Sequence, residues 1–328
     1  MILKAKASHI EAANEVLDFI HHNDSFLVSA HINADGDAVA SVIAVGQLLE
    51  HFKKRYYMVL NDAQINTRYS YLKNFDRIIT YNFALDLQIK AAIILDVPGT
   101  KRLGNVEKLL PHRSKTIRID HHPEEDDFAV ISMADEKASS TTQLVYEILN
   151  QATIKIDLDL AQAIYTGIVY DTGRFSFSNT TSRDMYICGK MIDIGVEPSK
   201  INDRIFFENS FDAIRTIGRG LAEIEHYLHG AVNVIYLDHT TMSRDHHGEI
   251  EELANYSVAI RGGKVGIFIR EIRPRFHKIS LRAKEEVDVN QVAKKFNGGG
   301  HTRASGCQID GTKREVIEKL LAEIKKQL

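Results

Sequence analysis

The feature that most constrains this chain is the alternation of short apolar runs with helical segments along its first half. Four runs are short and apolar enough to form buried strands, namely Phe26–Ala30, Tyr56–Leu60, Ala91–Leu95 and Thr116–Ile119. Apolar residues recur at helical spacing in Ser8–His22, Ala38–His51, Leu103–His112, Ser139–Asn150, Leu158–Tyr170 and Ser182–Ile194. Strands that alternate with helices predict a parallel sheet, so we expect an α/β domain here.

The second half predicts a smaller α+β domain. Strands are expected at Ala231–Leu237, Ser257–Ile260, Lys264–Ile269 and Lys278–Ala283, and helices at Val289–Phe296 and Lys313–Gln327. Gly195 and Pro198 mark the best boundary between the halves. We therefore expect a first domain over 1–195, a linker over 196–210 and a second domain over 211–328.

Charge and cysteine content limit the class of protein. Residues 1–210 carry 22 basic against 28 acidic residues, and residues 211–328 carry 19 against 16. An acidic half joined to a basic half suits a metal-loaded domain and a domain that binds an anion. Cys188 and Cys307 lack disulfide or metal spacing, and no apolar run has transmembrane length. We expect a cytoplasmic protein without a membrane segment.

The first candidate site follows the Phe26–Ala30 run. His31, Asp35 and Asp37 lie within seven residues, where ligands bind at the carboxyl ends of strands in open α/β sheets. The alternative is a polar loop in which Asp37 caps the next helix. For the three residues together, metal binding is the better interpretation.

Two further strand ends carry the same kind of residue. Asp96 ends the Ala91–Leu95 run, where the following Val-Pro-Gly also fits a simple turn. Asp120, His121 and His122 follow Thr116–Ile119, and adjacent side chains point different ways. One histidine can therefore bind a metal while the other faces a substrate; the alternative is a surface pair.

Asp171 ends the predicted helix Leu158–Tyr170, with Gly173 as its stop. A carboxylate is unfavourable at the negative end of the helix dipole unless a cation lies nearby. Carboxylate and imidazole ligands without thiolates favour Mn²⁺ or Mg²⁺ over structural Zn²⁺. Two such ions about 3.5–4 Å apart can bridge a water, lower its pKa and clamp a phosphoryl group for in-line attack.

A glycine-rich loop in the second half offers a site for an anion. Gly298, Gly299 and Gly300 expose backbone N–H groups, and His301 and Arg303 follow them. A flexible turn is the usual explanation for such glycines. The stretch 261–284 holds eight basic residues, and Arg282 is the best candidate for a phosphate contact because its strand leads towards the loop.

Taken in order, the motifs HINADGD, Asp96 with RLG behind it, DHH, DTGRF and GGGHTRASG resemble the DHH phosphoesterase superfamily with its DHH-associated second domain. Length and spacing are similar to the NrnA group within it. The family usually has proline where this chain has Ala34, and the residues Val-Pro-Gly after Asp96 are unusual. The resemblance implies two divalent ions, bound by His31, Asp35, Asp37, Asp96, His121 and Asp171.

The resemblance also assigns roles in catalysis and substrate binding. Asp96 would bridge the ions, His122 would contact the scissile phosphate, and Asp120 would orient its neighbours. The second domain would bind the substrate from across a cleft, through Arg282, His301, Arg303, Gly299 and Gly300.

The implied enzyme is a phosphodiesterase that degrades very short single-stranded RNA or DNA (nanoRNA) and dephosphorylates 3′-phosphoadenosine 5′-phosphate (pAp). A hydroxide bridged by two metal ions would attack; Mn²⁺ is favoured, with Mg²⁺ or Co²⁺ as options, and a homodimer is open. The only aromatic residues in 261–284 are Phe268 and Phe276, which favours the end of an oligonucleotide over a long strand. The alternatives are a RecJ-like exonuclease, a phosphodiesterase for cyclic or linear dinucleotides, an inorganic pyrophosphatase and an inactive nucleotide sensor.

Overall fold

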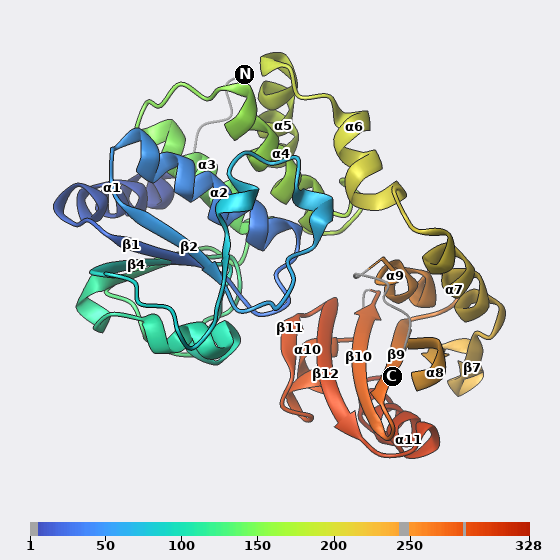
Figure 1. Cartoon of the computed structure of the whole chain (residues 1–328). Helices are drawn as coiled ribbons and strands as arrows, with labels where there is room; N and C mark the ends of the chain where they lie inside the picture. Colours follow the sequence, from blue (N-terminus) through green and yellow to red (C-terminus); the bar gives the residue numbers. More distant parts are fainter. Residues whose placement is uncertain (1–5, 243–248, 285–286) are drawn as a thin grey trace. The chain divides into compact units, whose positions relative to one another are not determined.

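The computed structural model describes residues 6–242, 249–284 and 287–328 and divides into two compact units (Figure 1). The first unit is Met1–Glu208 and the second is Asn209–Leu328. The finer division into domains over 1–195 and 211–328 with a linker stays a prediction. Within the described residues, no helix is long and apolar enough to cross a membrane.

The first unit is built on a six-stranded parallel sheet in the order β3-β2-β1-β4-β5-β6. Its strands are β1 Phe26–Ser29, β2 Tyr56–Leu60, β3 Ile79–Thr80, β4 Ala91–Leu95, β5 Thr116–Asp120 and β6 Ile131–Ala134. The predicted α/β class is therefore confirmed. Because all strands run the same way, the ends of β1, β4 and β5 meet at one edge of the sheet.

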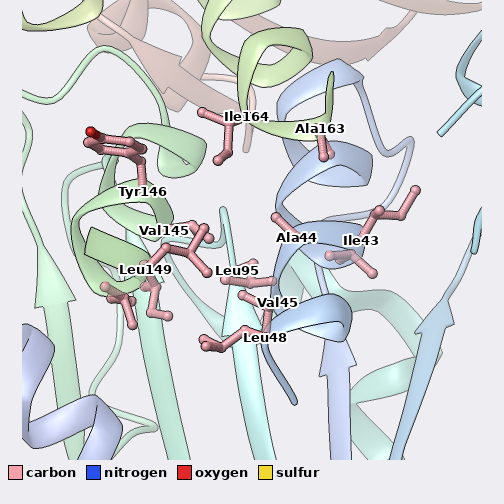
Figure 2. Close-up of a cluster of buried hydrophobic side chains, with 14 of the residues drawn as sticks. Ile43, Ala44, Val45, Leu48, Leu95, Val145, Tyr146, Leu149, Ala163 and Ile164 are labelled. Carbon is pink, nitrogen blue, oxygen red and sulfur yellow. The ribbon is translucent and has the colours of Figure 1, made fainter. Parts of the chain in front are cut away.

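Helices cover one face of this sheet (Figure 1) and bury its main core. They are α1 Ala7–His22, α2 Gly36–His51, α3 Thr141–Gln151, α4 Leu158–Asp171 and α5 Ser182–Ile194. Figure 2 shows Leu48 of α2, Leu149 of α3 and Ile164 of α4 gathered around Leu95 of β4. Alternate residues of β4 face the second core, to which Ala92 and Ile94 belong. Burial on both faces explains why this strand is an unbroken apolar run.

Leu103 and Val106 complete the second core, and the secondary structure predicted for their segment was wrong. Leu103–His112 was expected to be one helix, but the structure has a 3₁₀ segment, η3, over Thr100–Leu109. Gly104 breaks it with a φ of 61°, a backbone conformation that glycine adopts without strain. A Cβ at this position would overlap Ile32 and Asn61, so the break lets η3 lie against the β1 and β2 ends.

The second unit contains a mixed sheet in the order β11-β12-β10-β9-β8-β7. Its strands are β7 Glu225–Tyr227, β8 Val232–Leu237, β9 Val265–Arg273, β10 Phe276–Ala283, β11 Gly299–His301 and β12 Ala304–Asp310. Its longer helices are α7 Phe211–Ala222, α9 Glu252–Val258, α10 Val289–Lys294 and α11 Lys313–Ile324. One core packs α10 and α11 against the sheet, and a separate core includes α7 and α9 residues.

Two predictions for this unit were wrong. Ser257–Ile260 is not a strand, because Ser257 lies in the last turn of α9 and donates its hydroxyl to Ala254 O over 2.7 Å. A run of four residues cannot separate a strand from a helix end by periodicity. The glycine segment is also no simple loop: β11 and β12 pair as a hairpin.

Candidate metal centre

The turn after β1 places the first predicted ligands. Asp35 is the N-cap of α2, and its Oδ1 accepts from Asp37 N at 3.0 Å and Ala38 N at 3.1 Å. The alternative in which Asp37 caps this helix is therefore wrong, since Asp37 lies inside the first turn. His31 Nδ1 lies 2.8 Å from Ile32 O, and its Nε2 is 3.8 Å from Asp35 Oδ1.

Asp37 is fully buried and held by the start of another helix. Its two carboxylate oxygens accept from Thr141 N at 2.7 Å and Thr142 N at 3.0 Å, and from the Thr142 hydroxyl. These are N-terminal groups of α3, which favour a negative charge. Sequence reasoning missed both threonines; the run of small hydroxyl residues that includes Ser140, the N-cap of α3, was the available signal.

Asp96 lies at the centre of the arrangement. Its Oδ2 is 3.3 Å from His31 Nε2, and its Oδ1 is 3.4 Å from His121 Nε2 and 3.0 Å from the Thr141 hydroxyl. Ligand atoms of His31, Asp35 and Asp96 lie within 4.8 Å of one another, and so do those of Asp37, Asp96 and His121. One carboxylate is thus shared by two groups of side chains that could each hold a metal ion.

The two histidines after β5 face different partners. The centroids of their rings are 4.6 Å apart, and the angle between the ring planes is 68°. His121 Nε2 is 3.1 Å from Asp171 Oδ2, whereas His122 Nδ1 is 2.8 Å from Asp120 Oδ1 and 3.4 Å from Asp96 Oδ1. The solvated-pair alternative is excluded for His121, which is buried.

Asp171 is the last residue of α4. Gly173, Arg174 and Phe175 follow in the left-handed region, with φ of 52°, 60° and 64°, and the predicted stop at Gly173 agrees with this turn. The side chain of Asn179 donates to the backbone carbonyl of Asp171 over 3.0 Å. The turn therefore holds the carboxylate at a helix end where its charge needs compensation.

Burial and mutual repulsion shift the pKa values of these groups strongly. Burial, with the charges of Asp96 and Asp171, raises the pKa of Asp37 well above its usual value. Burial also raises the pKa of Asp171 to about 6 despite the neighbouring His121. Burial would lower the pKa of His31 and His121, but their carboxylate partners raise both well above the ordinary value. The raised carboxyl pKa values reflect burial and repulsion between clustered negative charges, and a bound cation would relieve that repulsion.

The donor set fits divalent cations. All six predicted ligands lie in the first unit and converge at the carboxyl ends of β1, β4 and β5 and the end of α4. Oxygen and imidazole donors, several of them buried carboxylates, are the ligands that hard and borderline divalent ions prefer. The site can hold metal.

Comparison with known protein families identifies the family to which the chain belongs. Residues 25–168 match the DHH family, N-terminal domain, and residues 232–328 match the DHHA1 domain. The chain is a DHH-family phosphoesterase.

The relatives of this DHH phosphoesterase match it over most of their length. The bifunctional oligoribonuclease and PAP phosphatase NrnA of Bacillus subtilis is 28% identical, covering 90% of this chain and 92% of the relative. The protein of the same name from Thermus thermophilus is 24% identical, covering 92% and 89%. A crystal structure of an exopolyphosphatase-related protein from Bacteroides fragilis shares the fold, with a TM-score of 0.87, 22% identity, and coverage of 99% and 98%.

The structure shows what the two departures from the family pattern, Ala34 and the residues after Asp96, do locally. The N–H of Ala34 donates to Asp62 Oδ2 over 3.4 Å, a bond that a proline could not form. Val97 is buried and its carbonyl accepts from Arg118, while the carbonyl of Pro98 accepts from Glu125 N over 2.9 Å. The unusual residues after Asp96 thus anchor its turn to β5 and to the segment after it.

In the second unit of the DHH phosphoesterase, two predicted substrate residues lie at the same level across three neighbouring strands. Arg282 of β10 pairs with Ala304 of β12, and Ala304 pairs with His301 of β11. Paired residues of neighbouring strands point to the same face of a sheet, so Arg282 and His301 share a face. Arg282 donates to Asn255 Oδ1 over 3.0 Å, and His301 is partly exposed.

The remaining predicted substrate residues, Arg303, Gly299 and Gly300, belong to the β11–β12 hairpin and its contacts. Arg303 Nη1 donates to the carbonyls of Lys284 and Val287 over 3.1 and 3.0 Å. Gly299 and Gly300 lie in β11, where Gly300 has a φ of 139° and no room for a Cβ beside Ala304 O. The close pairing of β11 with β12 is therefore a sufficient reason for a glycine at position 300.

Proposed function

We propose that this phosphoesterase hydrolyses very short single-stranded RNA or DNA oligonucleotides and also removes the 3′-phosphate of pAp. The observation that carries the proposal is the sharing of Asp96 between two groups of metal-binding side chains. Two divalent ions held side by side are a common device for hydrolysing phosphate esters. The NrnA relatives, whose names state this pair of activities, support the choice of substrates.

The proposed metal set assigns His31 and Asp35 to one ion and Asp37, His121 and Asp171 to the other, with Asp96 between them. When bound, the ions would activate water and neutralise charge on the phosphate. Mn²⁺ is the proposed native ion because the set mixes carboxylates with imidazoles. The threonines that bind Asp37 and Asp96 keep these carboxylates oriented.

His122 is the proposed contact to the scissile phosphate. It lies beside the metal ligand His121 and is less buried, and Asp120 bonds its Nδ1 over 2.8 Å. Asp120 is fully buried and its oxygens accept from Arg118 and His122, so its proposed role is to orient the imidazole rather than to touch the substrate.

The second unit is the proposed binding unit for the nucleotide. Glu251 supports this proposal: burial would raise the pKa of this carboxyl, but the charges of Arg270, Lys278 and Arg282 lower it. Arg282 and His301 lie on the same sheet face. A phosphate or terminal nucleotide is the ligand we propose for them, with Arg303 and the β11 glycines shaping the hairpin.

A competition experiment separates this function from its rivals. The protein with Mn²⁺ is mixed with equal concentrations of a labelled dinucleotide and a labelled 20-mer, and pAp, a cyclic dinucleotide and pyrophosphate are assayed alone. We expect the dinucleotide to disappear first and pAp to release phosphate. Faster loss of the 20-mer would support a RecJ-like exonuclease, cleavage of pyrophosphate alone a pyrophosphatase, and no turnover a nucleotide sensor.

A further inference from the structure

Arg118 is a buried cation beside the metal centre whose role the proposed mechanism does not yet include. It lies in β5, two residues before Asp120, and its side chain is 1% exposed. A guanidinium is costly to bury unless its N–H groups all find acceptors. Arg118 makes four hydrogen bonds, to acceptors in the two turns that carry the site and directly after them.

The contacts of Arg118 join those turns. Its Nε donates to the carbonyl of Val97 over 3.0 Å, directly after Asp96. Its Nη2 donates to Asp120 Oδ2 over 2.7 Å and to the carbonyl of His122 over 3.1 Å. Its Nη1 donates to Glu124 Oε2 over 2.8 Å. A rigid planar fork can hold these acceptors at once, whereas a lysine ammonium cannot match their spread.

The contact with Asp120 determines how His122 is held. With Oδ2 bound to Arg118, Oδ1 accepts from both His122 N at 3.1 Å and the His122 ring at Nδ1, 2.8 Å away. An ionised carboxylate can only accept, so the ring must carry a hydrogen on Nδ1, which in the neutral ring leaves the lone pair on Nε2. The ring orientation and tautomer of His122 thus depend on where Arg118 places Asp120.

We infer that Arg118 is a positioning residue for hydrolysis, which acts by fixing Asp120 and, through it, the tautomer and orientation of His122. It also ties the turn that carries Asp96 to the turn that carries the histidines. The inference rests on the proposed function in that His122 is taken to contact the scissile phosphate.

The kinetic test uses Arg118→Lys, which keeps the charge but not the fork. With Mn²⁺ and a dinucleotide we expect kcat to fall about 10- to 100-fold, as for other groups that orient metal-site residues, with KM and Mn²⁺ stoichiometry nearly unchanged. Arg113→Lys is the matched control, because Arg113 binds Asp127 at the surface over 2.6 Å, and it should behave like the wild type. An unchanged kcat for Arg118→Lys overturns the inference.

A double substitution separates positioning from general stability. In an Asp120→Asn background, Arg118→Lys should lower kcat by less than about threefold, because the path to His122 is already broken. An equal loss in both backgrounds would make Arg118 merely structural and overturn the inference. Should Arg118→Lys fail to fold, Arg118→Gln with Asp120→Asn replaces it: kcat equal to that of Asp120→Asn alone supports the inference, and a further tenfold loss overturns it.

A readout without turnover distinguishes this inference from the proposed function. In ¹⁵N-histidine NMR spectra with Mg²⁺, the His122 signals are those missing from His122→Gln. We expect the Nδ1–H tautomer in the wild type and a mixture of tautomers in Arg118→Lys or, should that variant fail to fold, in Arg118→Gln with Asp120 retained. Identical tautomers in both overturn the inference even if the wild type cleaves dinucleotides, whereas a wild type without turnover sinks only the proposed function.

Discussion

At the scale of single residues, Asp96 combines three unusual properties. It is buried, it has a left-handed backbone with φ of 57°, and both its oxygens face other ligand residues. Its N–H donates to Ile119 O over 3.1 Å, which fixes the turn against the neighbouring strand. Asp and Asn tolerate this conformation better than most side chains. Asparagine is therefore a replacement that tests the charge without breaking the turn.

The first prediction concerns Asp96→Asn. Loss of the shared charge should weaken both proposed ion sites, so kcat should fall by orders of magnitude. The hydrogen bonds of Asp96 with His31 and His121 lower its pKa although burial opposes them, so the carboxylate is ionised without metal. Thermal unfolding in a chelator should stay similar or rise, because one repelling charge is removed. Near-normal turnover at saturating Mn²⁺ would contradict the bridging role.

The convergence of the candidate ligands could be predicted from sequence for a simple physical reason. Parallel strands end at one edge, so polar residues after β1, β4 and β5 must meet there. Arg118 and Thr142 could not be predicted in the same way. Arg118 reads as a polar interruption of a strand, and Thr142 reaches Asp37 only because α3 begins beside α2. Their roles depend on contacts between elements that are distant in sequence.

At the scale of elements, the site depends on how closely α2, α3 and α4 approach. Gly167 of α4 lies against Thr142 and Asp37, and a Cβ added there would overlap both side chains. Gly36 of α2 lies against the ring of Tyr170 in the same way. Two glycines thus let the helix ends that carry candidate ligands come together.

The second prediction compares two glycines. Gly167→Ala should displace Asp37 or Thr142, lowering both the unfolding temperature and the affinity for Mn²⁺. Gly189→Ala is the control: this glycine lies inside α5 with nothing within 4 Å of an added Cβ. Alanine there should stabilise the protein by up to about 1 kcal/mol through helix propensity. Equal effects in calorimetry and metal titration would rule out the proposed close contact.

Elements were predictable where one periodicity held over enough residues. α5 and β4 have the bounds expected from sequence, because each is flanked by clear turn residues. The end of α9 and the η3 segment were not predictable. A four-residue apolar run fits either structure, and the break at Gly104 reflects a tight approach to β1 and β2 rather than a local preference.

At the scale of the whole molecule, each unit has its own cores and its own share of the proposed chemistry. The six candidate ligands belong to the first unit, and Arg282 and His301 belong to the second. Their sequence motifs predicted this division of labour. The strand order of the second sheet could not be predicted, because the parallel pairing of β8 with β9 leaves no recognisable pattern in the sequence.

The third prediction follows from that division. Arg282→Ala and His301→Ala should each lower kcat/KM for a dinucleotide about 10- to 100-fold, because a charge-assisted contact is worth roughly 1.5–3 kcal/mol. The number of bound Mn²⁺ ions should not change. Arg314→Ala is a matched control, since Arg314 is exposed on α11 and its Nε donates to Glu318 Oε1 over 2.7 Å. Wild-type kinetics for both test variants would refute the binding role of the second unit.

The fourth prediction concerns pH and metal removal. The pKa of Asp171 is about 6 and those of Asp37, His31 and His121 are also raised. In each case the folded state binds protons more tightly than the unfolded state, so the metal-free protein should lose stability as pH rises from about 4 to 8. With Mn²⁺ the trend should reverse, because protons compete with the ion. Unfolding temperatures measured in chelator and in Mn²⁺ should therefore diverge as pH rises.

The spread of the candidate ligands along the chain has a consequence for synthesis on the ribosome. His31 leaves the ribosome early, but its partners Asp96 and His121 follow much later, and Asp171 ends α4. A nascent chain that stops before α4 has packed would expose unbalanced acidic groups and could hold ions only loosely. Because domains fold largely as units during synthesis, metal loading of this enzyme should begin only once the whole first unit has emerged.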